Sequence, residues 1–455
     1  MPAHLTLETL KADVAAGTID TVLTCVIDMQ GRLMGKRFHA AHFVDHVAEG
    51  ETHGCDYLLA TDLEMYTVPG YTFSSWQKGY GDYVHKPDLS TLRRVPWLPA
   101  TAMVICDILD HHTHEPVPHA PRTVLKRQIE RARAAGFDPM MATELEFFMF
   151  EAAYDTLRDG RYTDLRTRNR YNIDYAIFGT TKEEDVMRAI RNGLHDAGVP
   201  VECTKGEAEV GQEEINVRYA DALATADHHA IVKNACKEIA HAHGRSITFM
   251  AKYATDKAGS SAHVHQSLMG ADGPAFHDPA GEHGMSATMR SYLAGLLAHS
   301  TEITAFLAPY VNSYKRFTEG LFAPTKSVWS TDNRTAGFRV CGAGTKGVRV
   351  ECRIGGADLN PYLALAAQLA AGLAGIEKGM ELEPESRGDV YQAGNVTEVP
   401  RTLRLAADAL DGSAMLRAAM GEAVVDHYVR AARWEIEVLD RTVTDWDLMR
   451  GFELA

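Results

Sequence analysis

The sequence lacks several features that would assign a protein to a class at once. The longest apolar run of the 455-residue chain, Tyr362 to Ile376, is too short to cross a bilayer and contains Gln368, so it predicts a buried helix. The N-terminal segment has no basic stretch followed by an apolar core, so it predicts an amphipathic helix and no secretory signal. There is no GxxxxGK[ST] segment, so a nucleotide would not be held by a P-loop.

Paired cysteines and an excess of positive charge are also missing. The seven cysteines show neither a CxxC pair nor the spacing of a disulfide framework, which predicts free packing thiols in a reducing cytoplasm. A formal net charge of -15 argues against a surface for nucleic acid or for an anionic membrane. With 45% hydrophobic and 24% charged residues, the chain is globular in composition and longer than one hydrophobic core usually allows.

A small sheet domain is expected before a larger domain. "IDTVLTCVIDMQGRLMGKRF" predicts two strands around a turn, and Val104 to Ile108 predicts another strand. A segment rich in proline and histidine, Asp110 to Pro121, precedes an amphipathic helix, so we expect domains at 1–112 and 113–455. We expect the "HHTH" histidines in this segment to be solvated, because no regular element fixes them as metal ligands. The later strands and helices mix without regular alternation, which predicts an α+β fold.

What the sequence does contain is a repeated strand pattern with polar residues on one face. In "ATELEFFMF", Glu144 and Glu146 project on the same side because a strand places residues i and i+2 on one face. The pattern recurs in three further segments: "QEEINVRY" with Glu214, Asn216 and Arg218, "SAHVHQSL" with His263 and His265, and "KGVRVECRI" with Arg349, Glu351 and Arg353.

Two interpretations of these polar faces are open. They can be ordinary solvent faces of antiparallel strands, or they can converge around a cavity. Glu, His and Arg favour convergence, because these residues meet in metal and phosphate sites, whereas Lys, Ser and Thr are more usual on a wet face. Carboxylates predominate over histidine, so the expected ion is Mg²⁺ or Mn²⁺. Neighbouring arginines would then bind anionic oxygens, which is the arrangement used in phosphoryl transfer.

Seven segments, in order along the chain, resemble the glutamine synthetase family. They are "ELEFFMF", "GEAEVGQEEINVRYADALATADHHAIVKNACKEIA", "GSSAHVHQSL", "NSYKRF", "DNRTAGFRV", "KGVRVECRIGGADLNPYLALAA" and "VTDWDLMRGFE". The resemblance implies a small N-terminal β-grasp-like domain and a catalytic domain whose curved antiparallel sheet forms a funnel. It also implies hexameric rings, usually paired as dodecamers, with each active site between subunits. ATP and glutamate would enter opposite ends of the funnel, with two or more divalent ions between them.

The resemblance also assigns roles to individual residues. One ion would be held by Glu146, Glu207 and Glu214, and the second by Glu144, His263 and Glu351. Glutamate is assigned to Glu146, Gly259, His263, Arg316, Arg339 and Arg353, and catalysis to Asp56, Arg316 and Arg334. ATP is assigned to Glu202, Tyr219, His265, Ser267, Arg334, Lys346 and Arg349. The plain alternatives are a surface pair for Lys346 and Arg349 and core packing for Tyr219.

The implied reaction has two steps. The γ-carboxylate of glutamate attacks the γ-phosphate of ATP, and a nitrogen nucleophile that has lost a proton then attacks γ-glutamyl phosphate. Glutamine-forming members carry a Glu in "YEAP" beside the ammonium ion, whereas this chain has Phe322 in "LFAP". An apolar pocket suits a polyamine, ethanolamine or alkylamine, so the sequence predicts a glutamate–amine ligase. The alternatives are a glutamine synthetase that uses another base, such as Glu319, and a non-catalytic assembly.

Other departures from the family pattern concern the amine side and regulation. Asp56 in "GCDYLLATD" is the best match to the family's ammonium-side Asp, with Asp62 as a rival. Thr397 stands where adenylylated bacterial enzymes carry a Tyr, so that modification is predicted to be absent, and the nearby Tyr391 lies outside the motif. Ala258 stands where the family commonly has Asn in the flap before His263.

Overall fold

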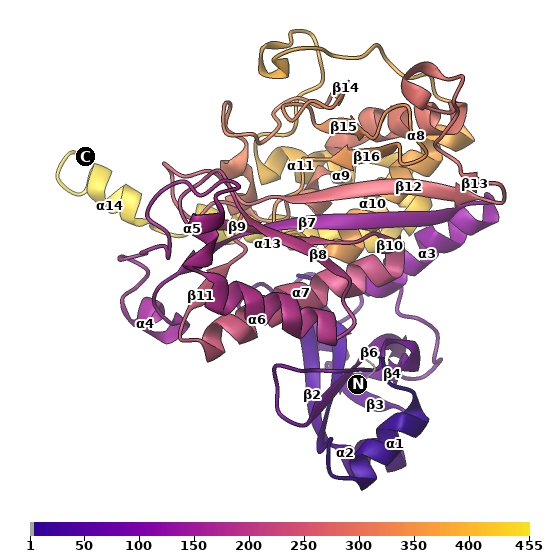
Figure 1. Ribbon diagram of the computed structural model, residues 1–455, viewed down its shortest axis with the longest axis vertical. Helices are drawn as coiled ribbons and strands as arrows, with labels where there is room; N and C mark the ends of the chain where they lie inside the picture. The colour runs from indigo at the N-terminus through magenta and orange to yellow at the C-terminus, as the bar shows by residue number, and fades with distance from the viewer. Residues whose placement is uncertain (1–3) are drawn as a thin grey trace.

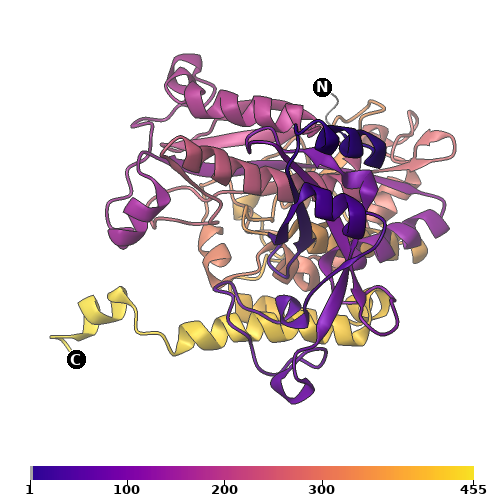
Figure 2. The same cartoon turned by 90° about the horizontal axis from the view of Figure 1, so that it is seen from below.

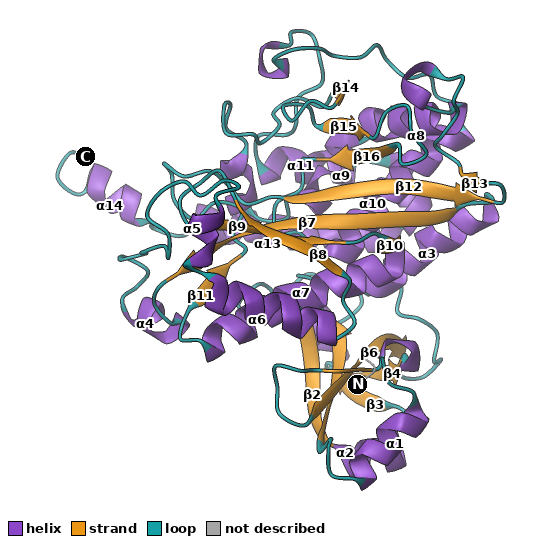
Figure 3. Ribbon diagram, viewed as in Figure 1, coloured by secondary structure: helices purple, strands orange, loops and turns teal. Residues whose placement is uncertain are grey.

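A computed structural model describes residues 4–455 and contains two β-sheets with helices packed around them (Figure 1). Figure 3 shows the smaller sheet at one end of the molecule and the larger sheet crossing its body, with helices along it. The α+β fold with curved strands that the sequence predicted is confirmed. The two sheets fall on either side of residue 112, although the domain boundary itself stays a prediction.

The first sheet is formed by early strands in the order β2-β1-β6-β4-β3, with β5 paired to β6. β1 and β6 are parallel, and the other pairs are antiparallel. The predicted N-terminal helix and the strands before residue 110 are confirmed, whereas the β-grasp-like assignment stays a prediction. The elements are α1 (Leu7–Ala15), β1 (Thr21–Ile27), β2 (Leu33–His39), α2 (Ala40–His42), β3 (Thr52–Cys55), β4 (Asp82–Pro87), β5 (Arg93–Arg94) and β6 (Thr101–Asp110).

The second sheet has the order β14-β15-β16-β12-β7-β9-β8, so segments far apart in the sequence become neighbours. β10 and β11 pair with β7, and β13 pairs with β12. All pairs are antiparallel except β14–β15, which is parallel and corrects the expectation of a purely antiparallel sheet. The strands are β7 (Asp138–Phe150), β8 (Val201–Gly206), β9 (Gln212–Val217), β10 (Ala220–Asp221), β11 (Ser246–Thr248), β12 (Ala262–Gly270), β13 (Gly273–Pro274), β14 (Trp329–Thr331), β15 (Phe338–Cys341) and β16 (Arg349–Cys352).

The helical part of the core is centred on α10 (Pro361–Glu377), which contains the apolar run singled out in the sequence. Its residues from Pro361 to Gly375 are buried, and it contacts helices α3, α7, α8, α9 and α12, so the buried-helix prediction is confirmed. Among residues 4–455, no helix combines the length and the apolarity needed to cross a membrane. The other helices are α3 (Pro121–Ala134), α4 (Tyr154–Asp159), α5 (Ile177–Thr181), α6 (Glu184–Asp196), α7 (Ala222–Ala242), α8 (Ala287–Ala298), α9 (Ser300–Leu307), α11 (Leu403–Asp411), α12 (Ala414–Met420), α13 (Glu422–Asp440) and α14 (Asp445–Gly451).

The cysteines and the histidine cluster mostly follow the expectations from the sequence. All seven cysteines are free, and five are buried. Cys203 is exposed, so the expectation of packing is wrong for that residue. His111, His112 and His114 lie exposed in the turn after β6, as expected for a solvated segment.

A buried arginine on α3 connects the first sheet to the helical core. The Arg122 guanidinium donates to Asp107 of β6 at 2.6 Å and to Asp88, just after β4, at 2.8 Å. It also donates to the buried Asp227 of α7 at 3.0 Å, and that carboxylate accepts a 2.6 Å hydrogen bond from Tyr362 of α10. One side chain therefore holds together elements on both sides of the predicted domain boundary.

We predict that Arg122→Met destabilises the protein strongly, because it leaves Asp227 buried without its cation. Breaking one partner of a buried ion pair typically costs about 3–5 kcal/mol. The free energy of unfolding, measured by urea titration, should fall by that amount. The control is Arg127→Met on the exposed face of the same helix, where a change within about 0.5 kcal/mol is expected. Equal losses in the two variants would contradict the prediction.

Candidate active site

The polar faces found in the sequence lie side by side on the strands β16, β12, β7 and β9. The register of these strands explains how the side chains meet, because residues opposite each other on one face of a sheet are neighbours. Glu144 lies opposite both His263 of β12 and Asn216 of β9, Glu146 lies opposite Glu214 of β9, and Glu351 of β16 lies opposite His265 of β12.

The first carboxylate group consists of Glu146, Glu207 and Glu214, the residues assigned to one ion. One ligand atom from each lies within 4.8 Å of the others, and Glu207 follows directly after β8. The pKa of Glu214 is raised to about 8, first by burial and then by the charges of Glu144, Glu146 and Glu207. Burial also raises the pKa of Glu146. The described residues therefore do not neutralise three carboxylates here, and Glu214 holds a proton near pH 7.

Lys205 is a member of this site that the sequence reasoning missed. Its ammonium group forms an ion pair with Glu207 and lies 4.5 Å from the centre of the Tyr175 ring. Burial would raise the pKa of Glu207, but the hydrogen bond and the charge of Lys205 lower it. The signal was present in the sequence, because residues 205 and 207 have the i, i+2 spacing of one strand face.

Gln212 and Ser261 were also missed, and both hold Glu146 in place. The backbone N–H of Ser261 donates to Glu146 Oε2 at 2.7 Å, and Gln212 Nε2 donates to the same oxygen at 3.2 Å. Gln212 Nε2 also donates to the carbonyl of Gly259 at 3.0 Å. These contacts join segments distant in the sequence, so no local pattern predicted them.

The second group surrounds Glu144 and is shared between two histidines. Glu144 belongs to two sets of possible ligand atoms that lie close together. One set adds Glu214 and His263, and the other adds His265 and Glu351. His263 Nδ1 lies 3.3 Å from Glu144 Oε2 and 3.7 Å from Glu351 Oε1, so the three residues assigned to the second ion are neighbours. His263 Nε2 is buried without a hydrogen-bond partner, which suits a metal ligand.

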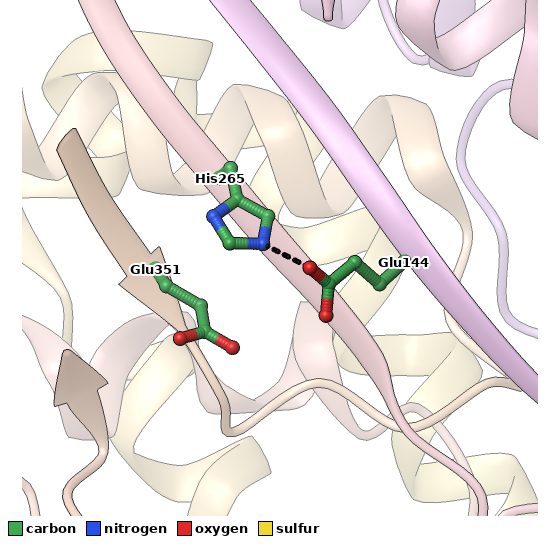
Figure 4. A group of neighbouring side chains, drawn as sticks. All are labelled: Glu144, His265 and Glu351. Carbon is green, nitrogen blue, oxygen red and sulfur yellow. Dashed lines mark hydrogen bonds and ion pairs between the residues drawn. The ribbon is translucent and has the colours of Figure 1, made fainter. Parts of the chain in front are cut away.

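His265 holds Glu144 in a defined orientation. Figure 4 shows the imidazole pointing at the Glu144 carboxylate, where His265 Nε2 lies 2.8 Å from Oε1. Arg349 Nε donates to His265 Nδ1 at 3.1 Å, so Nδ1 is the acceptor and the proton of a neutral ring lies on Nε2. Burial would raise the pKa of Glu144, but hydrogen bonds from His263 and His265 hold it far below its usual range.

Glu351 is paired with two of the arginines that were assigned to glutamate. Arg353 donates to Glu351 Oε1 at 2.6 Å, and Arg339 donates to Oε2 at 3.1 Å. Glu351 is only 1% exposed. Although burial raises its pKa, the charges of Arg353 and His263 outweigh burial and lower the pKa to about 2. This carboxylate is therefore ionised, and its charge is balanced by the two arginines.

Arg316 is buried in this structure, and its side chain is bonded mainly to the backbone. Its guanidinium donates to the carbonyl groups of Arg353, Ile354 and Gly355 at 2.8–3.1 Å and to the hydroxyl of Ser261 at 3.2 Å. Gly259 packs against it so closely that an added Cβ would lie 2.4 Å from Arg316 Cγ. The assignment of Arg316 to glutamate stays a prediction, and it requires the guanidinium to release some of these carbonyls.

A cavity of about 360 Å³ adjoins the second group, with Glu144 and His265 in its wall. Its apolar walls include Met140, Met141 and Met269, which suit a flat aromatic ring. Tyr219 is 67% exposed, so the core-packing alternative for this residue is wrong. Six of the seven residues assigned to ATP line the cavity: Glu202, Tyr219, His265, Ser267, Lys346 and Arg349.

The remaining candidates lie outside the cavity and the carboxylate groups. Asp56 begins a 3₁₀ turn after β3, is buried, and accepts a 2.7 Å hydrogen bond from Ser74, while burial raises its pKa. Asp62 accepts a hydrogen bond from Trp434 of α13 at 3.2 Å. Phe322 is 56% exposed and has a φ of +58°, and Arg334 is exposed. None of these four residues belongs to the carboxylate groups or lines the cavity.

Five carboxylates and one imidazole beside a cavity can hold hard divalent cations next to a polyphosphate. The raised pKa of Glu214 fits such ions, because a divalent cation would take the place of its proton. Lys346 and Arg349 in the cavity wall fit phosphate oxygens.

Comparisons with known proteins agree with this site. The sequence model described as "Glutamine synthetase, catalytic domain" matches residues 118–450. The γ-glutamylethanolamide synthetase of Streptomyces coelicolor is 48% identical over 449 residues, which cover 99% of this chain and 96% of that protein. The glutamate–isopropylamine ligase of a Pseudomonas species is 36% identical over 439 residues, with 96% and 95% covered. A solved structure of a protein named GmaS, without ligand, has a TM-score of 0.83 and 29% identity, with 97% of this chain and 99% of that chain covered.

We predict that metal binding at about pH 7 releases a proton, because Glu214 has a pKa of about 8 and must ionise to become a ligand. Calorimetric titration with Mn²⁺ in two buffers of different ionisation enthalpy should show close to one proton released near pH 7. Release should be much smaller near pH 10, where Glu214 is already ionised.

Two variants make this measurement specific. Glu214→Gln should lose the released proton and bind Mn²⁺ more weakly. Glu209→Gln is the control, because Glu209 is paired with Lys257 and belongs to neither carboxylate group. The same proton release near pH 7 and near pH 10 would contradict the assignment.

Proposed function

The chain belongs to the glutamine synthetase family, and from this membership we propose that it is an ATP-dependent glutamate–amine ligase. It would join the γ-carboxylate of L-glutamate to an amine through γ-glutamyl phosphate, with release of ADP and phosphate. The observation that carries the proposal is the contact between the carboxylate groups and the cavity that contains six residues assigned to ATP.

The names of two relatives support an amine as the second substrate. A γ-glutamylethanolamide synthetase and a glutamate–isopropylamine ligase each carry a small amine in the name, and both match nearly the whole chain. Phe322 supports the same choice, because it replaces the carboxylate that glutamine-forming members place beside the ammonium ion. The runner-up is a glutamine synthetase that uses ammonia.

Each part of the site has a separate task in this proposal. We call the cavity lined by the residues assigned to ATP the nucleotide cavity. The ion nearest to it would be held by Glu144, His263 and Glu351. The ion nearest glutamate would be held by Glu146, Glu207 and Glu214. Mg²⁺ or Mn²⁺, when bound there, supplies positive charge that offsets the charge of the transferring phosphate.

The basic side chains add to that charge compensation. Lys346 and Arg349 at the cavity wall would bind phosphate oxygens, and Arg339 and Arg353 lie against the Glu351 carboxylate.

The amine side is proposed to be completed by a neighbouring subunit. Asp56 lies in the first sheet domain, away from its own chain's carboxylates, and would accept the proton of the amine in the adjacent site. We propose a homo-oligomer, a dodecamer of two hexameric rings, in the cytoplasm. Figure 2 shows the C-terminal segment projecting from the body, and its side chains Trp446, Met449 and Phe452 are 65%, 88% and 83% exposed, which supports burial against another subunit.

We predict phosphate release with ATP, glutamate and a small amine, and slower turnover with ammonium. A panel of ammonium, ethanolamine, isopropylamine and spermidine, each with Mg²⁺ or Mn²⁺, measures this directly. Phe322→Glu should shift the preference toward ammonium, because it restores a carboxylate beside the nitrogen. Glu351→Ala should remove activity with every amine. Fastest turnover of ammonium by the unchanged protein would favour a glutamine synthetase instead.

We also predict that the C-terminal segment is needed for assembly. Introducing charge with Met449→Asp and Phe452→Asp should lower the mass of the particle measured by analytical ultracentrifugation, because both side chains would be buried in the assembly. The control is Asp445→Asn in the same helix, which should leave the mass unchanged. A monomeric unchanged protein would contradict the proposed assembly.

A further inference from the structure

A second cavity lies where the early part of the chain meets helix α13. Figure 2 shows purple segments of the first hundred residues lying against the yellow α13 helix, and two hydrogen bonds fix this contact. Arg430 Nε donates to the carbonyl of Pro69 at 2.8 Å, and Trp434 Nε1 donates to Asp62 at 3.2 Å. The cavity walls come from the β1–β2 turn, the segment 61–71 and helices α9, α10, α11 and α13. We call it the α13 cavity, and it shares no lining residue with the nucleotide cavity.

Aromatic rings and acidic groups line the α13 cavity together. The rings of Tyr71, Phe306, Tyr310, Tyr428 and Trp434 form much of its wall, and the carboxylates of Asp62 and Glu435 lie beside them. No lysine, arginine or histidine lines it. Aromatic faces and a carboxylate around a small space are the chemistry that recognises an organic ammonium ion.

Glu435 is the group in this wall that lacks a partner. Among residues 4–455, no cation and no hydrogen-bond donor pairs with its carboxylate, whereas Asp62 is occupied by Trp434 and by the backbone of its own turn. The pKa of Glu435 is raised to about 7, first by burial and then by the charges of Asp62 and Glu64. The pKa shift therefore reports a half-buried carboxylate that the fold does not neutralise.

The nearby arginines do not fill this role, because each has other partners. Arg32 pairs with Asp28 at 2.7 Å, and Arg430 pairs with Glu437 at 2.7 Å and with the carbonyl of Pro69. Among residues 4–455, no side chain is left to supply the positive charge that would neutralise Glu435.

The size of the α13 cavity limits the ligand. Its volume of about 60 Å³ is that of about two water molecules in the liquid, where each takes roughly 30 Å³. That space accepts a primary ammonium ion with a few carbon or oxygen atoms and excludes a long polyamine.

We propose that the α13 cavity binds a small primary alkylammonium ion, with its charged group against Glu435 and its carbon chain between the aromatic rings. This site is separate from the reaction centre, and the proposal does not depend on the ligase activity proposed above. A bound ion would connect the segment 61–71 to α13. That segment directly follows the 3₁₀ turn Asp56–Leu59, so occupancy of the cavity would steady the backbone that carries Asp56.

Calorimetric titration of the whole protein with 2-hydroxyethylammonium chloride tests the proposal, with EDTA present and without ATP or glutamate. We expect saturable binding. Ethylene glycol, the neutral molecule of the same size, should not bind, and spermidine should bind more weakly. Glu435→Gln should weaken binding by about ten- to a hundredfold, the usual worth of a charge-assisted hydrogen bond.

Matched variants separate this site from the reaction centre. Asp440→Asn, an exposed carboxylate on the same helix that pairs with Arg404, should bind the ion as the unchanged protein does. Absence of saturable binding, equal binding by Glu435→Gln, or equal binding of ethylene glycol would overturn the proposal. Loss of binding in Phe322→Glu with retention in Glu435→Gln would place the ion in the reaction site and would also overturn it. Because no ATP is present, none of these results decides whether the protein is a ligase.

Discussion

Repulsion between carboxylates on one face of a sheet is the constraint on which the rest of the site depends. The register of β7 with β9 and β12 brings Glu144, Glu146 and Glu214 together, and β16 adds Glu351. Two arginines neutralise Glu351, two histidines hold Glu144, and Lys205 pairs with Glu207. Glu214 is left without such a partner, and its raised pKa records the deficit. The protein therefore folds with most of its site charge balanced, and the proposed divalent ions would complete the balance.

The sequence predicted the polar strand faces because alternation is a local property that needs no knowledge of the fold. Glu144, His263 and Glu351 could be named in this way, and the family resemblance added Glu207, which lies beyond the end of a strand. Gln212 and Ser261 could not be named, because their contacts with Glu146 arise from strand order. Arg316 shows the limit of a motif: its position follows the family pattern, yet in this structure its donors are on the backbone carbonyls of Arg353, Ile354 and Gly355.

The amine side stays a prediction for a related physical reason. Asp56 and Phe322 were identified by what stands at matching positions in relatives, and such a match carries no information about distance. The structure puts Asp56 directly after β3 of the first sheet and leaves Phe322 exposed in a turn. The α13 cavity was invisible in the sequence because its wall joins segments more than 300 residues apart, such as Asp62 and Trp434.

The chain of hydrogen bonds from Arg349 through His265 to Glu144 has a thermodynamic consequence. Arg349 and His265 line the nucleotide cavity, and Glu144 belongs to the second carboxylate group. In the proposed site, a nucleotide that moves Arg349 would change the orientation of Glu144 and so the affinity for the metal. Binding free energies are linked reciprocally, so the metal must change the affinity for the nucleotide by the same factor. The two proposed ligands of this site would therefore be coupled through a single imidazole.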